Sequence, residues 1–224
     1  SSAASDVYKR QVLGYAKENI LAGSWINEHM LHLPDSPLLD DMPWGTNLKS
    51  KEELPTPPRT TWLGYRNQTG PAGTRNLLGI VTTVQCVAGV VRVAVERIRK
   101  ELLPKYPNVD DVVAVTHPYG CGVAINAPMA CIPIRAITNV IRHPNFGGEL
   151  MIVGLGCEKL TYDRILPPED ITPKNCLTLQ DCKGHDAMMQ AILDMAEQKL
   201  QKLNQRHREE LPLSDLLIGM QCGG

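Results

Sequence analysis

Leu77-Leu-Gly-Ile-Val-Thr-Thr-Val84, which leads directly into Gln85-Cys86, is one of four short apolar runs that end on a cysteine or histidine in a turn. The others are residues 112–116 before His117-Pro-Tyr-Gly-Cys-Gly122, residues 151–155 before Gly156-Cys-Glu158, and residues 216–220 before Gln221-Cys222. Each run has the length of a strand, and its nearly continuous apolar character is typical of a strand that is covered on both faces. The four runs therefore predict a buried parallel sheet.

Segments with helical periodicity alternate with these runs. Apolar residues recur at helical spacing in residues 87–102, 123–141 and 185–203, and prolines within the second segment predict a kinked or split helix. Residues 176–180 are a further short strand candidate. Alternation of strands and helices predicts an α/β fold, with a parallel sheet, flanking helices and right-handed crossovers.

The composition divides the chain into four parts. Residues 1–11 match no element and are interpreted as a non-native lead-in, whereas residues 12–33 predict a small β piece. Residues 34–61 contain six prolines, which fix φ and remove hydrogen-bond donors, so we expect an extended linker there. The α/β pattern fills residues 62–224. We expect this domain to be truncated at its C-terminal end, because a glycine pair after a strand usually marks a close backbone approach to a ligand.

Charge and hydropathy exclude several classes of protein. The net charge of −1, without a cluster of Lys and Arg interleaved with aromatic residues, argues against nucleic-acid binding. No stretch of about 18 apolar residues is present, and the first residues lack the apolar core of a signal peptide. The seven cysteines are an odd number without a disulfide-framework spacing, which favours reduced thiols and a cytoplasmic location.

The residues that follow the four runs predict a shared site. Carboxyl ends of parallel strands lie along one edge of the sheet, where ligands bind. Thiolates favour iron or zinc, and the absence of C-x-x-C spacing argues against a zinc finger. Packing is the alternative, because free cysteine is among the most buried residue types. The predicted metal ligands are Cys86, Cys121, Cys157 and Cys222.

His117 and Glu158 are the candidate catalytic residues of this edge. A histidine at a strand end can act as a base near neutral pH or bind a metal, and Gly120 and Gly122 permit a close backbone approach. Glu158 could bind a metal or transfer a proton. The alternatives are an imidazole that satisfies a turn and a carboxylate in the first turn of a helix.

Two Arg-Asn pairs precede the first run. Arg66-Asn67 and Arg75-Asn76 flank a glycine-containing loop, and an arginine fork can bind a carboxylate at two points while asparagine adds amide contacts. The alternative is a solvated hairpin held by Asx turns. No Gly-Lys-Ser/Thr motif and no G-x-G-x-x-G motif after a strand is present, so neither a P-loop nor a nicotinamide site is supported.

Several motifs together resemble the galactarate/altronate dehydratase family over residues 12–224, and the run Cys121-Gly-Val-Ala-Ile-Asn-Ala-Pro128 is more similar to the galactarate branch. The motifs are Gly64-Tyr-Arg-Asn, Gly73-Thr-Arg-Asn-Leu-Leu-Gly, Cys86-Val-Ala-Gly, His117-Pro-Tyr-Gly-Cys-Gly, Asn145-Phe-Gly-Gly-Glu, Gly154-Leu-Gly-Cys-Glu-Lys-Leu and Gly219-Met-Gln-Cys-Gly-Gly.

This resemblance implies a hydro-lyase that converts D-galactarate into 5-dehydro-4-deoxy-D-glucarate with a divalent metal, usually iron. It also implies that residues 12–33 are the end of a SAF-like module. Loss of water from an aldarate needs a base for the proton α to a carboxylate and a cation to stabilise the enediolate. His117 is the predicted base, the four cysteines are the predicted metal ligands, and the predicted substrate contacts are Arg66, Asn67, Arg75, Asn76 and Gly120.

Three alternatives stay open at this point. An iron–sulfur cluster held by three of the four strand-end cysteines could replace the single metal ion. The substrate could be a related, altronate-like sugar acid. The chain could also be a non-catalytic fragment that binds sugar acids and whose cysteines belong to the core. A homodimer is the expected assembly.

Overall fold

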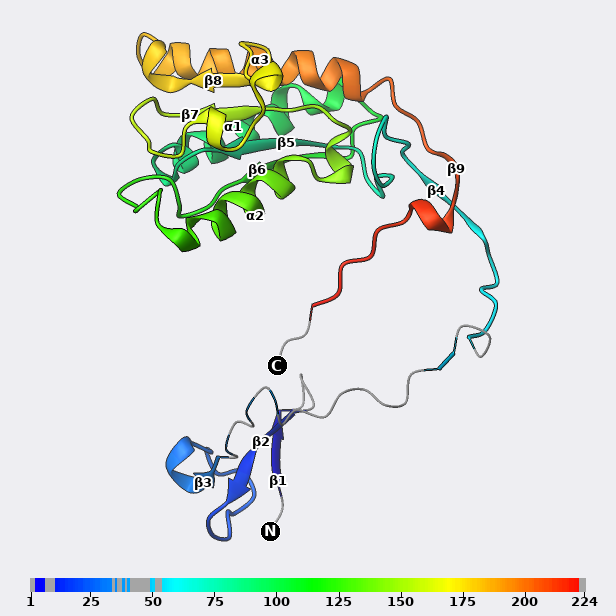
Figure 1. Cartoon of the computed structure of the whole chain (residues 1–224), viewed down its shortest axis with the longest axis vertical. Coiled ribbons are helices and arrows are strands. Elements are labelled where there is room, and N and C mark those ends of the chain that lie inside the picture. The colour runs from blue at the N-terminus through cyan, green and yellow to red at the C-terminus, as the bar shows by residue number, and fades with distance from the viewer. Residues whose placement is uncertain are drawn as a thin grey trace. The chain divides into compact units, whose positions relative to one another are not determined.

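The computed structural model describes residues 3–6, 11–33, 35, 38, 40, 49–50 and 54–221 (Figure 1). The chain divides into two compact units, one formed by residues 1–58 with 218–224 and the other by residues 59–217.

The larger unit is built on a four-stranded parallel sheet with the strand order β6-β5-β7-β8. The strands are β5 (Leu77–Thr82), β6 (Asp111–Val115), β7 (Ile152–Gly154) and β8 (Cys176–Thr178). The chain passes from β5 outward to β6 and then returns across β5 to β7, so the order of the strands reverses between β5 and β7. Sheets of this kind bind ligands beyond the carboxyl ends at this reversal.

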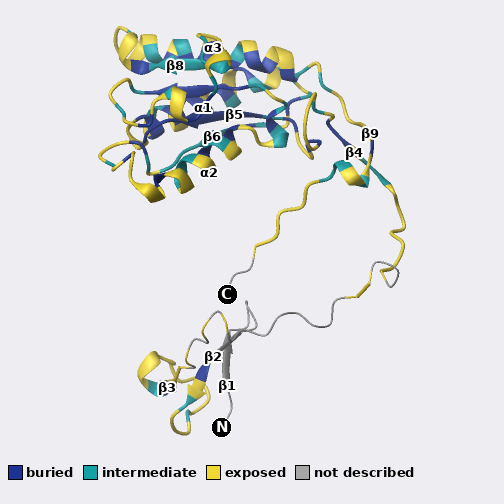
Figure 2. Cartoon of the chain, in the orientation of Figure 1, coloured by how far each residue is buried: buried dark blue, intermediate teal, exposed yellow. Residues whose placement is uncertain are grey.

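Helices cover both faces of the sheet, as the sequence predicts. Helices α1 (Ala88–Glu101) and α3 (His185–Leu203) share one hydrophobic cluster with the sheet, and α2 (Cys131–Ile141) belongs to a second cluster. Side chains of β5 alternate between the clusters, with Ile80 in the first and Val81 in the second. Figure 2 shows the strands as the most buried part of this unit. The prediction of an α/β fold is confirmed.

An antiparallel strand pair closes the amino edge of this sheet. Strand β4 (Thr61–Gly64) pairs with β9 (Glu209–Pro212), so the segment before β5 is joined to the segment after α3 (Figure 1). The indole N–H of Trp62 donates to the carbonyl oxygen of Pro212 at 3.1 Å, which strengthens the pair. The sequence does not predict this pairing, because the two strands lie about 150 residues apart and neither is strongly patterned.

The fourth strand of the sheet is β8, and the prediction of a strand over residues 216–220 is wrong. Leu217 and Ile218 are 65% and 71% exposed, and this segment joins no ladder in the part of the chain that the structure describes. A strand needs the backbone groups of a neighbour. Here β8 occupies the edge position beside β7. Cys222 lies outside the described residues.

The smaller unit contains a three-stranded antiparallel sheet in the order β1-β2-β3. Its strands are β1 (Ala3–Asp6), β2 (Gln11–Ala16) and β3 (Leu31–His32). A small β piece is therefore present, but it begins earlier than the sequence predicts, because residues 1–11 contain β1 and the first residue of β2.

The predicted linker is described only in part. Residues 54–60 are exposed and belong to no helix or strand, whereas most of residues 34–53 lie outside the described part of the chain. In the described residues, none of the helices has the length and apolar character needed to cross a membrane.

Candidate active site

Three of the predicted cysteines lie at the carboxyl edge of the parallel sheet. Cys86 is in a 3₁₀ turn, Gln85–Val87, between β5 and α1. Cys121 is in the turn that follows β6, and Cys157 is in the turn that follows β7. All three are exposed and free, so they are available to a ligand and do not fill the core.

Contacts between the loops hold this edge together. The carbonyl oxygen of Gly120 accepts hydrogen bonds from the backbone N–H groups of Lys159, at 3.0 Å, and Leu160, at 3.4 Å. On its other side Gly120 packs against β5 so closely that a Cβ atom would overlap the carbonyl oxygen of Thr83. Its φ of +108° also favours glycine. The loops after β5, β6 and β7 therefore form one structure.

The three thiols interact with one another. The pKa of Cys86 is raised, first by partial loss of hydration and then by Cys121, through both charge and a hydrogen bond; the charge of Cys157 adds to it. A nearby cation would offset the effect of these two neighbours on the Cys86 thiol. Among residues 54–221, no three His, Cys, Asp or Glu side chains are placed to hold one metal ion.

His117 joins the end of β6 to the end of β5. Its Nε2 lies 2.7 Å from the carbonyl oxygen of Thr82, and its Nδ1 accepts the backbone N–H of Tyr119 at 3.2 Å. A carbonyl can only accept, so Nε2 carries the proton and Nδ1 is the acceptor. Burial lowers the pKa of His117, and this outweighs the hydrogen bond to the Thr82 carbonyl, which favours the charged ring. The ring is neutral at pH 7 and both nitrogens have partners.

Glu158 organises the turn after β7. Its Oε1 accepts the hydroxyl of Thr83 and the N–H of Leu155, the latter at 3.0 Å, while Oε2 accepts the N–H of Gly156 at 2.6 Å. Burial would raise the pKa of this carboxyl, but the hydrogen bonds outweigh burial and leave the pKa lowered. Glu158 is thus ionised and bonded to the backbone, so the structure gives it a role in holding the loops.

A cleft of about 400 Å³ opens beside His117, where β6 ends and α1 begins. Its one arginine, Arg92, donates a hydrogen bond from Nη2 to Oγ1 of Thr116 at 3.0 Å. Arg92 is not predicted as a site residue from the sequence, because its position fits the exposed face of an ordinary helix. The lining residues are Gln85, Ala88, Gly89, Arg92, Thr116, His117 and Pro118.

The two Arg-Asn pairs lie at the opposite, amino edge of the sheet, because they precede β5 in the chain. Arg66 forms ion pairs with Glu209 and, at 3.8 Å, with Asp215. The guanidinium of Arg75 has no hydrogen-bonding or ionic partner in the described residues. The structure therefore does not bring these arginines and the strand-end cysteines together in a single site.

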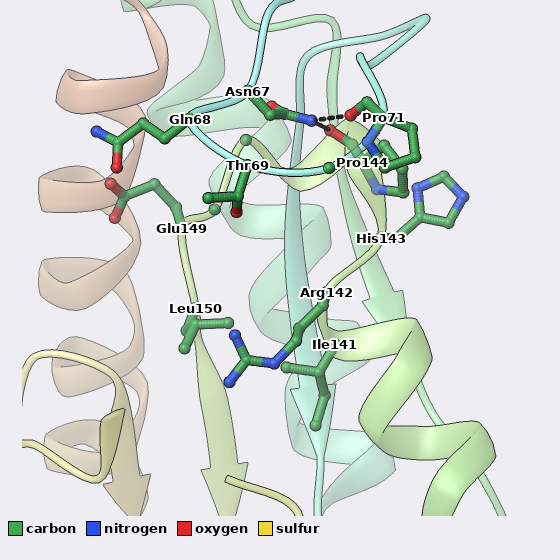
Figure 3. Close-up of a pocket in the computed structure, with 13 residues that line it drawn as sticks. Asn67, Gln68, Thr69, Pro71, Ile141, Arg142, His143, Pro144, Glu149 and Leu150 are labelled. Carbon is green, nitrogen blue, oxygen red and sulfur yellow. Dashed lines mark hydrogen bonds between the residues drawn. The ribbon is translucent and has the colours of Figure 1, made fainter. Parts of the chain in front are cut away.

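Both asparagines have structural roles. Asn76 is fully buried; it donates to the carbonyl oxygens of Asn108 and Leu203 at 2.8 Å and accepts from Arg206 at 2.9 Å. Asn67 also accepts from Arg206, at 2.7 Å. Its amide donates to the carbonyl oxygens of Pro71 and Pro144, and Figure 3 shows both hydrogen bonds.

Asn67 lines a second cleft of about 450 Å³ at this amino edge, shown in Figure 3. The charged groups around it already have partners in the fold. Arg142 pairs with Asp170 at 2.7 Å, and Glu149 pairs with Lys199 at 3.0 Å. The thiols, His117 and Arg92, an arginine without an acidic partner in the described residues, lie instead at the carboxyl edge, which we take as the candidate active site.

Comparison with known proteins identifies relatives of this chain. The chain is 53% identical over 222 residues to galactarate dehydratase (L-threo-forming) of Escherichia coli. It is 33% identical to altronate dehydratase of Bacillus subtilis and 29% identical to altronate dehydratase of Escherichia coli. These alignments cover 95–96% of the chain but only 41–42% of each relative, so the chain spans about two fifths of their length.

A family model described as D-galactarate dehydratase/altronate hydrolase, second domain, matches residues 64–204. The matched segment begins at the end of β4 and ends just after α3, so it contains the whole parallel sheet and its three helices. The resemblance drawn from the motifs is confirmed, and the chain belongs to the D-galactarate dehydratase/altronate hydrolase family.

Proposed function

We propose that this chain is part of a hydro-lyase that converts D-galactarate into 5-dehydro-4-deoxy-D-glucarate. The identity of 53% to a galactarate dehydratase, against 33% and 29% to two altronate dehydratases, carries this proposal and favours galactarate over altronate. The exposed thiols and His117 at the carboxyl edge support it, because they provide a reactive surface where such sheets bind ligands.

His117 is our candidate for the base. The reaction takes a proton from the carbon next to a carboxylate and expels the hydroxyl of the following carbon. The lone pair of Nδ1 is the only basic site on the neutral ring, and it accepts the N–H of Tyr119. His117 can accept a substrate proton once that hydrogen bond opens, and the bond from Nε2 to Thr82 then keeps the ring in place.

Iron is the proposed cofactor, bound by Cys86, Cys121 and Cys157, with Cys222 as a further predicted ligand. When bound, it would supply a Lewis acid that helps the hydroxyl depart. Three interacting thiols fit iron in chemical type. An iron–sulfur cluster, in which each iron takes its own thiolate, is the second candidate beside a lone Fe(II).

The remaining assignments stay predictions. Glu158 is a predicted catalytic residue, although its three hydrogen bonds support a positioning role. Arg66, Arg75 and Gly120 are predicted substrate contacts, as are Asn67 and Asn76, whose amides are already engaged in the fold. A homodimer is also a prediction, as is a cytoplasmic location, for which the free cysteines provide support.

The decisive experiment uses the full-length protein that contains this chain, purified without oxygen. We expect dehydration of D-galactarate, bound iron by metal analysis, and loss of both when Cys86, Cys121 and Cys157 are replaced together by serine. Replacement of Cys131, an exposed cysteine at the first position of α2 that is not among the predicted metal ligands, is the matched control. A brown protein that absorbs visible light indicates a cluster, and a nearly colourless iron protein indicates a lone Fe(II). Full activity of the triple variant would contradict the thiol site and favour a packing role.

A further inference from the structure

We propose that Arg92 binds a carboxylate of the substrate in the cleft beside His117. The proposal rests on the proposed function, because it assumes that the ligand of this edge is a sugar diacid. Arg92 would provide the cationic contact to the substrate that the sequence predicts at Arg66 and Arg75. Both of those arginines lie at the other edge of the sheet.

The charge of the cleft favours an anion. Arg92 is the only charged side chain among the seven lining residues, since His117 is neutral at pH 7 and the others are uncharged. No Asp or Glu side chain lines the cleft to neutralise the guanidinium. A carboxylate that entered this space would therefore meet a positive charge without a competing negative one.

Arg92 differs from the other arginines of α1 in having no acidic partner. Arg97 pairs with Glu101 at 3.0 Å, and Arg99 pairs with Asp111 at 2.8 Å. Within the described part of the chain, the one hydrogen bond of the Arg92 side chain goes to the neutral hydroxyl of Thr116. This bond uses Nη2 and orients the guanidinium, while the other N–H donors stay available for a two-point contact with a carboxylate.

Small residues leave room for the ligand. Gly89 lines the cleft, and a Cβ at this position would meet no atom within 4 Å. The volume of about 400 Å³ is near the lower end of the range for ligand pockets, about 300–1,000 Å³, which suits a small molecule. His117 lines the same cleft, so a carboxylate held by Arg92 brings the neighbouring carbon, the one that loses its proton, to the side of the cleft where His117 lies.

Binding can be tested independently of catalysis by NMR on this 224-residue chain. We expect added D-galactarate to shift the backbone amide signals of Gly89 and Thr116. We expect galactitol, which has the same carbon skeleton without the carboxylates, to leave them unchanged. Arg92→Gln should weaken galactarate binding by about tenfold to a hundredfold, the range for a charge-assisted hydrogen bond. Arg92→Lys should recover only part of the loss, because an ammonium cannot form the two-point contact.

Arg97→Gln is the matched control, since it removes an arginine from the same helix but away from the cleft, and it should bind galactarate like the wild type. Unchanged affinity of Arg92→Gln, or no shift at Gly89 with millimolar galactarate, would overturn the proposal. The dehydration assay is read separately. If the full-length enzyme dehydrates galactarate and Arg92→Gln leaves kcat/KM unchanged, the proposed contact between Arg92 and the carboxylate is wrong and the proposed function stands. If galactarate binds through Arg92 but is not dehydrated, the proposed function is wrong and the proposed contact between Arg92 and the carboxylate stands.

Discussion

At the scale of single residues, polar side chains hold the carboxyl edge in place by bonding to backbone groups of neighbouring loops. His117 connects Thr82 to Tyr119, and Glu158 connects the turn after β7 to Thr83. Such contacts fix the positions of the exposed thiols. They also determine which protonation state each of the two side chains adopts.

Replacement of His117 separates a base from a positioning residue. His117→Ala in the full-length enzyme should lower turnover by about a hundredfold or more, as expected for a general base. His117→Gln should lose nearly as much, although its amide can still donate to Thr82 and accept from Tyr119. Steady-state kinetics with galactarate provides the measurement. Turnover of His117→Gln within a few-fold of the wild type would show that His117 only positions the loop.

His117 should also make stability depend on pH. Burial lowers its pKa in the folded state, so between that pKa and the usual value near 6.5 the unfolded chain binds more protons. The contribution of His117 to stability is therefore complete above about pH 6.5 and is lost as the pH falls through the folded-state pKa. Thermal unfolding of the wild type and of His117→Gln between pH 7.5 and 5 checks this. The variant should lose less stability on acidification; equal losses would contradict the prediction.

Glu158 can be tested by its amide analogue. Glu158→Gln removes the charge and replaces one carboxylate oxygen by an N–H₂ group. This group cannot accept a hydrogen bond, so the N–H of Leu155 or of Gly156 loses its acceptor. The expected loss in the free energy of unfolding is about 1–3 kcal/mol, measured by urea denaturation. Glu169→Gln, at an exposed carboxylate, should change stability by less than about 0.5 kcal/mol. Equal stability of both variants would show that the bonds of Glu158 contribute nothing.

At the scale of elements, the loops after three adjacent strands are packed against one another at glycine. Gly120 lies in the loop after β6, contacts Thr83 and Val84 just after β5 and accepts two N–H groups from the segment after β7. Gly122, two residues later, also has a positive φ, of +67°, but nothing surrounds the position of its missing Cβ. The two positions therefore differ in packing and share the need for a left-handed backbone.

This difference predicts unequal effects of alanine. Gly122→Ala should cost about 1–2 kcal/mol, the usual penalty of a left-handed conformation. Gly120→Ala should cost about 1–3 kcal/mol more, because its Cβ overlaps the Thr83 carbonyl and the loops must separate. Urea denaturation measures both values. Gly120→Ala should also reduce iron binding through displacement of Cys121, whereas equal stabilities of the two variants would show that the close contact is not required.

At the scale of the whole molecule, residues 59–217 form a unit with its own hydrophobic core. Both hydrophobic clusters of this unit consist of described residues between 78 and 203. A domain of this length can bury enough apolar surface to fold by itself.

Deletion of residues 1–53 should therefore leave the larger unit folded. The chain that begins at Leu54 should unfold cooperatively, with a midpoint within about 4 °C of the full chain, the shift that about 1 kcal/mol produces in a domain of this size. Thermal unfolding followed by circular dichroism measures this. A broad or absent transition in the shortened chain would show that the larger unit depends on the smaller one.

The fold class could be predicted from the amino-acid sequence, because burial on both faces leaves apolar runs for strands and a period of 3.6 for helices. The sequence also indicated the carboxyl edge, since residues that directly follow parallel strands must lie there; Cys86, Cys121 and Cys157 needed no further information. It failed at residues 216–220, where an apolar run lacks a partner strand, and at β4 and β9, whose pairing joins segments far apart in the chain.

Which polar groups are free could not be predicted from the sequence, because it depends on the three-dimensional packing. Asn76 and Arg92 are both polar residues beside apolar runs, yet Asn76 is buried with all its hydrogen bonds made, and Arg92 lines a cleft without an acidic partner. Hydrogen-bond partners come from distant segments, such as Leu203 for Asn76 and Thr116 for Arg92. The spacing of residues in the sequence predicts the edge and the face of the sheet on which a residue lies. The partners and the remaining free donors depend on how the loops pack, and this packing separates Arg66 and Arg75 from the thiols.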